Sequence, residues 1–122
     1  MTTELQFTIE GPPRPKQRPR FYRGKVYTPQ ATRDYEQLCA AAGHEAVLLA
    51  REWETDRRYW VCLKIYFKDL RRRDLDNVEK SVCDGLNGIT WDDDCQIDYI
   101  QKRRFLDRNN PRIEVVIRYD RA

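Results

Sequence analysis

The sequence predicts an α+β fold, a mixed β-sheet with two main helices packed on it, and three observations support this class. Stretches with strand-like alternation occur near both ends and in the middle of the chain. Two stretches with helical spacing lie between them, so strands and helices are interspersed. At 122 residues, without a linker or an internal repeat, the chain has the length of one domain. We therefore expect a single domain over residues 1–122.

The N-terminal quarter combines a strand, a loop and a hairpin. Residues 5–10, LQFTIE, alternate between apolar and polar side chains and predict a strand. Residues 11–20 begin with Gly11 and are rich in proline, so they predict a loop that cannot join a central sheet. The stretch FYRGKVYT, residues 21–28, predicts a small hairpin that turns at Arg23-Gly24.

The first helix is predicted to start at Thr28-Pro29, where a capping residue is followed by a proline at the first helical position. Gly43 is a candidate weak point within this long helix, because glycine is a poor helix former. Its apolar face is expected to carry Tyr35, Leu38, Cys39, Ala42, Ala46 and Leu49.

The middle of the chain predicts a strand followed by the second helix. Residues 58–68 alternate, and the better core face consists of Tyr59, Val61, Leu63, Ile65 and Phe67. In the helix expected over residues 77–86, Asp76 is the predicted N-cap and Glu79 closes a capping box. Its buried stripe is expected to be Val78, Val82 and Leu86, with Cys83 alongside, and Gly85 and Gly88 are expected to help end it.

The C-terminal third predicts two further strands. Residues 88–94, GITWDDD, are expected to form a loop before a strand over residues 95–106. The turn-forming stretch DRNNPR leads into a last strand, IEVVIRY, in which Ile113, Val115 and Ile117 face one way.

Charge is segregated along the chain, although the net charge is only +3. Such segregation suits a surface that binds phosphates and carries a carboxylate pocket inside it, whereas a solvated basic surface is the simpler alternative. Phe21 and Tyr22 lie next to the basic residues of the N-terminal loop, and they either belong to the core or stack on opened bases. The candidate DNA-binding residues are Arg14, Lys16, Arg18, Arg20, Arg71, Arg72 and Arg73.

Other features of the sequence point to a protein of the reducing cytoplasm. The four cysteines contain no CxxC pair, so we expect them to be reduced and mostly buried, and the single histidine, His44, has no motif around it. There is no apolar run of the roughly 20 residues that a bilayer span needs. The first residues lack the pattern of a secretory signal. We therefore expect no membrane association.

The stretch RRRDLDNVEK, residues 71–80, concentrates the residues that can carry chemistry. Asp74 and Asp76 lie two positions apart, and Lys80 follows one helical turn later. Three further aspartates, Asp92 to Asp94, open another strand, and their carboxylates would converge with the first pair if the two strands were neighbours.

A divalent cation would offset the repulsion within such a cluster. Two carboxylates about 4 Å apart repel by about 4 kcal/mol at an effective dielectric of about 20. Oxygen ligands without histidine or cysteine favour Mg²⁺ or Mn²⁺. In phosphodiester hydrolysis the metal polarises the phosphoryl oxygen, and a lysine offsets charge in the transition state.

Each acidic residue also has a structural interpretation, because Asp76 can simply cap a helix and Asp92 and Asp93 can simply turn the chain. Two alternative functions therefore stay open. The protein could bind DNA structures without catalytic activity, or it could be a metal-dependent nuclease that acts on other branched or single-stranded nucleic acid. A small-molecule phosphotransferase is disfavoured, because the chain has no glycine-rich phosphate loop.

The stretch from Arg71 to Asp98 resembles the RusA family of Holliday junction resolvases, whose signature is DxDN followed by a lysine and then DDxQ. The opening PRPKQRPRF and the YTP before the first helix are similar to that family too. The resemblance implies a RusA-like fold and an active site of Asp74, Asp76, Lys80 and Asp94. The metal ligands would be Asp74, Asp76 and Asp94, with Asp93 as a further candidate.

The resemblance also implies a homodimer from a bacterium or prophage that nicks four-way DNA junctions in pairs with Mg²⁺. A dimer suits this substrate, because a junction has approximate two-fold symmetry.

Overall fold

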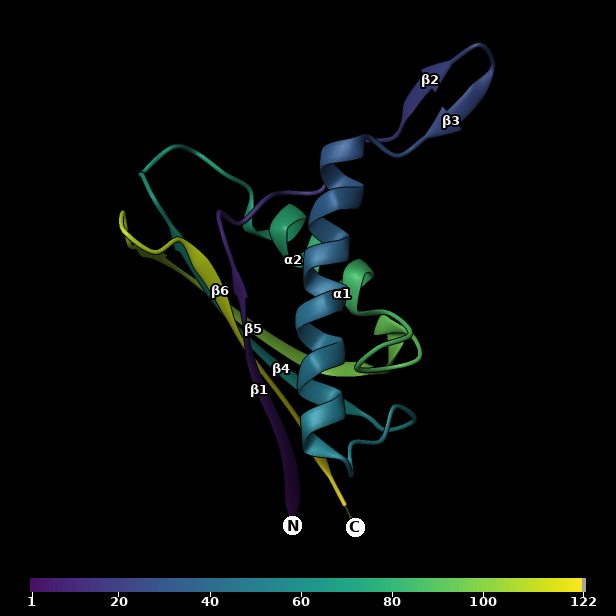
Figure 1. Ribbon diagram of the computed structural model, residues 1–122, viewed down its shortest axis with the longest axis vertical. Helices are drawn as coiled ribbons and strands as arrows, with labels where there is room; N and C mark the ends of the chain where they lie inside the picture. The colour runs from purple at the N-terminus through teal and green to yellow at the C-terminus, as the bar shows by residue number, and fades with distance from the viewer. Residues whose placement is uncertain (122) are drawn as a thin grey trace.

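The main sheet has four strands in the order β1-β6-β4-β5 in the computed structural model, which describes residues 1–121 (Figure 1). Strands and helices are interspersed along the chain, and the two helices and the mixed sheet confirm the α+β class. A second sheet, β2-β3, is the hairpin that the sequence predicts. The bounds are β1 Thr2–Glu10, β2 Arg20–Tyr22, β3 Lys25–Tyr27, α1 Gln30–Ala50, β4 Tyr59–Phe67, α2 Leu75–Leu86, the 3-10 helix η1 Asp94–Gln96, β5 Ile97–Leu106 and β6 Arg112–Asp120.

Strands β4 and β5 run parallel, whereas β6 is antiparallel to both β1 and β4. A parallel pair needs a crossover connection, and α2 supplies it by carrying the chain back along the sheet between the two strands. The start of β5 therefore lies beside the start of β4, where Ile97 is the partner of Tyr59. This pairing decides where the acidic residues after β4 lie relative to those before β5.

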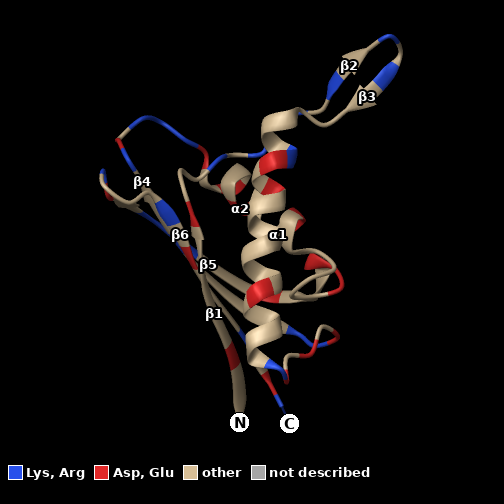
Figure 2. Cartoon of the chain, in the orientation of Figure 1, with Lys and Arg blue, Asp and Glu red and all other residues tan. Residues whose placement is uncertain are grey.

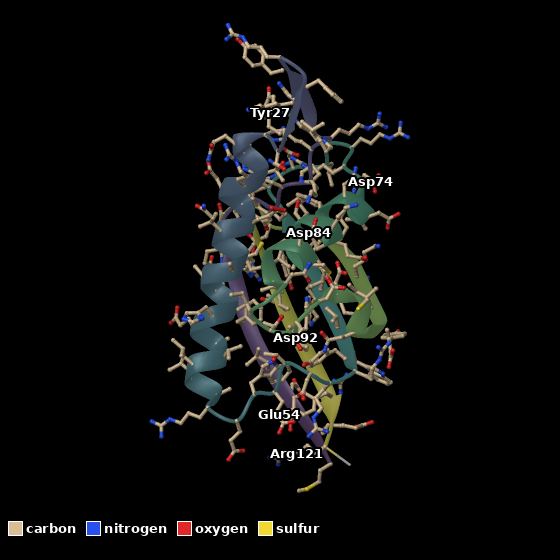
Figure 3. All side chains as sticks on the ribbon, turned by 90° about the vertical axis from the view of Figure 1, so that its right-hand side faces the viewer. Tyr27, Glu54, Asp74, Asp84, Asp92 and Arg121 are labelled. Atoms are coloured by element: carbon tan, nitrogen blue, oxygen red, sulfur yellow. The ribbon has the colours of Figure 1, made fainter. Side chains whose placement is uncertain are left out.

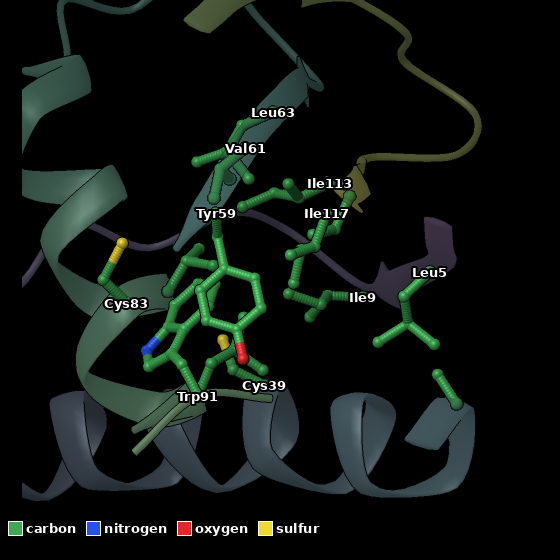
Figure 4. Close-up of a cluster of buried hydrophobic side chains, with 14 of the residues drawn as sticks. Leu5, Ile9, Cys39, Tyr59, Val61, Leu63, Cys83, Trp91, Ile113 and Ile117 are labelled. Carbon is green, nitrogen blue, oxygen red and sulfur yellow. The ribbon is translucent and has the colours of Figure 1, made fainter. Parts of the chain in front are cut away.

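Both helices cover one face of the main sheet, and the hydrophobic core lies between these two layers (Figures 1 and 4). The predicted inward faces are confirmed, since the alternate apolar residues of β4 and β6 and the stripe of α2 are all buried. Trp91 and Tyr59, which Figure 4 shows side by side, are fully buried in this core. The Trp53 ring stacks on Tyr59 with its centroid 5.7 Å away.

The two helices approach each other closely at two glycines. A Cβ atom at Gly85 would lie 2.7 Å from the backbone oxygen of Glu36 and 2.8 Å from the Cβ of Cys39. A Cβ atom at Gly43 would lie 2.6 Å from the Cδ2 atom of Leu86. Helix α1 continues through Gly43, so its weakness at this position stays a prediction, and a side chain there would require the end of the Leu86 side chain to move.

Two further details of α1 differ from the prediction. The helix begins at Gln30 after Pro29, and no side chain caps its first turn, so Thr28 is not the cap. Leu38 and Leu49 are exposed rather than part of the buried face, which instead includes Thr32 and Gly43. The buried face of α1 is narrower than apolar spacing alone indicates.

Helix α2 begins two residues earlier than predicted. Asp74 is its N-cap, because the Asp74 carboxylate accepts a hydrogen bond from the Asp76 backbone N–H at 2.9 Å. Asp76 lies within the first turn, so the prediction that Asp76 caps the helix is wrong. Gly85 lies inside the helix and does not end it, whereas Gly88 follows in the left-handed region with φ of +79°.

The hairpin β2-β3 projects beyond the N-terminal end of α1, at the same end of the molecule as the arginine-rich loop after β4 (Figure 2). Its turn is at Arg23 and Gly24, as predicted, and both residues have positive φ. Of the four cysteines, none forms a disulfide within residues 1–121, and only Cys95 is exposed. In the same described part of the chain, neither helix has the length and apolarity that crossing a bilayer requires.

Candidate active site

A pocket of about 600 Å³ lies between α2 and the beginning of β5. It brings together three of the four residues expected in the active site, namely Asp76, Lys80 and Asp94. Helix α2 contributes most of the wall, and β5 contributes Ile97 and Ile100. The pocket is lined by Asp76, Glu79, Lys80, Cys83, Asp84, Asp94, Ile97 and Ile100.

The acidic residues meet here for a different reason from the one predicted. The two strands are neighbours, but they are parallel, so Asp74 follows the end of β4 while Asp94 precedes the start of β5 at the opposite end of the sheet. Figure 3 shows Asp74 nearest the hairpin, Asp84 farther along and Asp92 farther still. Helix α2 spans this distance, and the i, i+4 spacing of Asp76, Lys80 and Asp84 places all three on one face.

Lys102 on β5 binds two carboxylates at the upper end of the pocket. Its ammonium forms ion pairs with Asp76 and, at 2.7 Å, with Glu79. Burial opposes the charge on Lys102, but the hydrogen bonds to Asp76 and Glu79 outweigh it and raise its pKa. The Asp76 side chain is 83% exposed despite this contact, so it stays accessible from solvent.

Asp94 is the aspartate of the DDD stretch that enters the pocket. Partial burial raises the pKa of its carboxyl group, and the negative charges of Asp93 and Asp84 raise it further, while Lys80 opposes the rise. The uncompensated charge around Asp94 is therefore negative. A cation bound in this pocket would offset that negative charge.

In the DDCQ stretch, residues 93–96, the side chains of Asp93 and Gln96 stabilise the local backbone. The Asp93 side chain caps η1 by accepting from the Cys95 N–H at 3.1 Å, and the Gln96 side-chain oxygen accepts a hydrogen bond from the Asp93 backbone N–H. The same Gln96 amide donates to the carbonyl groups of Thr55 and Arg57, both at 2.9 Å. Together these bonds hold the turn that points Asp94 toward α2.

Asp74 does not line the pocket, although its place two residues before Asp76 keeps it near the upper end. It is exposed, and one of its carboxylate oxygens accepts the helix-capping hydrogen bond. Asp92 is exposed as well, and it stands outside the pocket lining. The structure therefore separates the predicted acids into a pocket group, Asp76 and Asp94, and a capping group, Asp74 and Asp93.

The donors in the pocket fit a hard divalent cation. They are carboxylate oxygens, and the one thiol, Cys83, is buried, which raises its pKa to about 12 and keeps it protonated. Within residues 1–121, however, no three Asp, Glu, His or Cys side chains are gathered closely enough to hold a metal ion. The donor type and the negative potential fit a metal, and binding one would need the carboxylates to draw together.

The basic loop, residues 11–19, runs across the top of α2 beside this pocket. Its backbone bonds to the first turn of the helix through Lys16 N–H and Asn77 C=O, at 2.9 Å. The Lys16 ammonium is paired with Asp84 and, at 3.3 Å, with Glu36, so it ties the loop to both helices. Lys16 is thus held by protein carboxylates, unlike the three exposed arginines of this region, Arg14, Arg18 and Arg20.

The arginines before α2 also divide into two kinds. Arg73 is held in place, because its guanidinium binds Asp69 at 2.7 Å and lies over the Phe67 ring, 4.6 Å from the centroid. Arg71 and Arg72 are exposed and project from the loop. The exposed arginines that can contact a polyanion near the pocket are therefore Arg14, Arg18, Arg20, Arg71 and Arg72.

Sequence reasoning missed Glu79, Asp84 and Lys102 as residues of this site. Asp84 had a signal, since it continues the four-residue spacing of Asp76 and Lys80. Glu79 was assigned only to a capping box, which the structure does not form. Lys102 could not be found from spacing, because its position depends on how β5 lies against α2.

Comparison with known families identifies one match. The model of the endodeoxyribonuclease RusA family matches residues 10–118, which is most of the chain. No curated protein sequence matches this chain. The matched region includes α1, α2, η1 and the pocket between α2 and β5.

Proposed function

Because the chain belongs to the RusA family, whose members are endodeoxyribonucleases that resolve Holliday junctions, we propose that it cuts four-way DNA junctions with the pocket between α2 and β5 as its active site. The observation that carries this assignment is the meeting of Asp76, Lys80 and Asp94 in one pocket, although they are up to 18 positions apart in sequence. Asp74 completes the proposed catalytic set from the N-cap of α2.

The residues of the pocket have separable roles in hydrolysis. Asp76 and Asp94, with Asp74 near them, would hold a divalent cation, for which nucleases of this family generally have a requirement. A cation bound there would polarise a phosphoryl oxygen and stabilise the departing oxygen. In the reaction, a water oxygen bonds to phosphorus and the bond from phosphorus to one sugar oxygen breaks. We propose Mg²⁺ as the metal, with Mn²⁺ as a substitute, since both prefer oxygen ligands.

The two lysines have electrostatic roles and take no part in making or breaking bonds. Lys80 is exposed and lines the pocket, so its ammonium can approach the phosphate oxygens and offset the charge that grows on them in the transition state. Lys102 holds Asp76 and Glu79 from the sheet side and so fixes the direction of Asp76. The exposed arginines of the two loops bind neighbouring phosphates and hold the DNA over the pocket.

We propose that the protein acts as a homodimer. A four-way junction has approximate two-fold symmetry, and two copies related by the same symmetry would place one pocket at each of two strands of like polarity. One surface suits the contact between copies, because within residues 1–121 both helices lie on the other face of the sheet (Figure 1). Trp60 and Tyr99 are exposed on adjacent strands of the sheet, and their ring centroids are 5.3 Å apart. Paired nicking follows from this arrangement.

Incubation of the protein with a synthetic four-way junction, with and without Mg²⁺, tests the proposal. We expect two symmetric nicks per junction that depend on the metal, and little cutting of linear duplex, flap or single-stranded DNA of the same sequences. Binding without cutting in Mg²⁺ and Mn²⁺ would make the protein a junction binder. Preferential cutting of flaps or single strands would assign the pocket to another nuclease activity.

A further inference from the structure

The hairpin β2-β3 exposes large side chains that no other part of residues 1–121 covers. All six of its strand residues are exposed, and the exposed fraction is 76% for Phe21, 63% for Tyr22 and 45% for Tyr27. An isolated two-stranded hairpin is marginally stable in water. Exposed aromatic residues on such a hairpin indicate a binding surface.

The pairing of the two strands divides the hairpin into two different faces. Arg20 pairs with Tyr27 and Tyr22 pairs with Lys25, and residues that are directly opposite or two apart share a face. This face therefore alternates two cations with two aromatic rings. The other face carries Phe21 paired with Val26 and has no charge.

The charge around the hairpin favours a nucleic-acid partner. From residue 11 to residue 33 the chain contains seven lysines and arginines and neither aspartate nor glutamate. The Arg23 guanidinium lies over the Tyr22 ring, 5.3 Å from its centroid, so the ring is already part of a cationic surface. Rings that alternate with cations are typical of surfaces that stack on unpaired or unstacked bases while binding the phosphates beside them.

The hairpin also lies where a branched substrate would reach it. It stands at the same end of the molecule as Asp74, which begins α2, and as the arginine-rich loop (Figures 2 and 3). A linear duplex offers no exposed base faces along its length, whereas the centre of an open four-way junction leaves the terminal base pairs of its arms uncovered. The ring-bearing face can therefore distinguish the branch point from ordinary duplex.

We propose that the hairpin is a branch-point probe: Tyr22 and Tyr27 stack on the uncovered bases at the centre of the junction, while Arg20 and Lys25 bind the flanking phosphates. This inference rests on the proposed function, because it requires a branched DNA substrate. It adds a second contact to the site, one that selects the shape of the DNA and takes no part in the hydrolysis.

The test uses a four-way junction with 2-aminopurine at the branch, in buffer without divalent metal so that binding is measured apart from cutting. Wild-type protein is compared with the double variant Tyr22→Leu, Tyr27→Leu, which keeps the cations and most of the apolar volume. Phe21→Leu on the opposite face is the matched control. A linear duplex of the same sequence is the control substrate, and sedimentation velocity gives the oligomeric state of each protein.

We expect the double variant to bind the junction at least about fivefold more weakly and to lose the change in 2-aminopurine fluorescence, since one stacked base contributes roughly a five- to 150-fold change in affinity. Its affinity for linear duplex should stay unchanged, and Phe21→Leu should behave as wild type. Unchanged junction affinity and fluorescence in the double variant would overturn the inference. A shift to a smaller oligomer in Phe21→Leu, with junction binding lost in both variants, would also overturn it and assign the hairpin to contact with a second copy.

The wild-type measurement separates this inference from the proposed function. If wild-type protein does not prefer the junction to linear duplex, the proposed function fails before any variant is compared, and the inference fails with it. If wild type prefers the junction and the double variant does so equally, only the branch-point probe is wrong.

Discussion

Replacing Gly85 by alanine should destabilise the protein, because α1 leaves no room for a methyl group at this point. The new Cβ would lie 2.7 Å from the Glu36 carbonyl oxygen and 2.8 Å from the Cys39 Cβ. The first of these atoms is backbone, so the clash can be relieved only by moving one helix away from the other. Overpacking of this kind costs typically 1–3 kcal/mol, and a backbone clash belongs at the upper end of that range.

The net effect on stability follows from two opposed contributions. Alanine favours a helix over glycine by about 1 kcal/mol, which offsets part of the roughly 3 kcal/mol cost of the clash. We therefore expect a net loss of about 2 kcal/mol in the free energy of unfolding, measured by urea denaturation. For a chain of this length that corresponds to a fall in Tm of roughly 6–10 °C.

Gly43→Ala is the matched control, since it lies on the other helix at the same interface. Its Cβ would meet the end of the Leu86 side chain at 2.6 Å, and a side-chain end can rotate where a backbone carbonyl cannot. We expect a smaller loss for Gly43→Ala, within about 1 kcal/mol of wild type after the gain in helix propensity. A Gly85→Ala protein that melts at or above the wild-type temperature would refute this account of how α2 is placed.

Three further predictions concern the arginines, the cap and the turn before β6. Changing Arg14, Arg18 and Arg20 together to glutamine should weaken binding to all DNA sequences and reduce the slope of log K against log salt by about 2.7, and an unchanged slope would count against these phosphate contacts. Asp74→Ala should lower the free energy of unfolding by about 1 kcal/mol, whereas Asp74→Asn should keep the cap and yet lose nicking; equal stability of the two variants by urea denaturation would contradict the cap. A hydrogen bond from a neighbouring arginine lowers the pKa of Asp107, so this carboxylate stabilises the fold above the unfolded pKa of about 3.9, and that stability is lost as the pH falls through the folded pKa. When stability is measured as the urea midpoint, Asp107→Asn should therefore lose less of it than wild type between pH 5 and pH 2. Parallel curves of urea midpoint against pH for the two proteins would contradict this prediction.

The elements that follow from local pattern were predictable, and strand β4 is the clearest case. Its strict alternation of apolar residues predicts which side faces the helices, and all five predicted inward residues are buried. The stripe of Val78, Val82 and Leu86 on α2 was predictable for the same reason. Periodicity indicates which face is buried even when the partner is unknown.

The features that depend on long-range pairing were not predictable. The family resemblance implied that Asp94 belongs with Asp76, but the expected meeting of strand ends fails because β4 and β5 are parallel. The same limit explains Lys102, whose contact with Asp76 is set by the tertiary position of β5. The misplaced cap is a smaller error, since the helix begins two residues earlier at Asp74, a residue of the same type as the predicted cap Asp76.

Nicking of a four-way junction by Asp76→Asn in saturating Mg²⁺ tests the central claim most directly. Asp76 is 83% exposed and does not cap α2, so asparagine should leave Tm nearly unchanged while removing one of the charges proposed to hold the metal. We predict that cutting falls by orders of magnitude while junction binding is kept or tightened, because less negative charge faces the DNA phosphates. Cutting at close to the wild-type rate, by a variant with the wild-type melting curve, would contradict the assignment of this pocket as the active site.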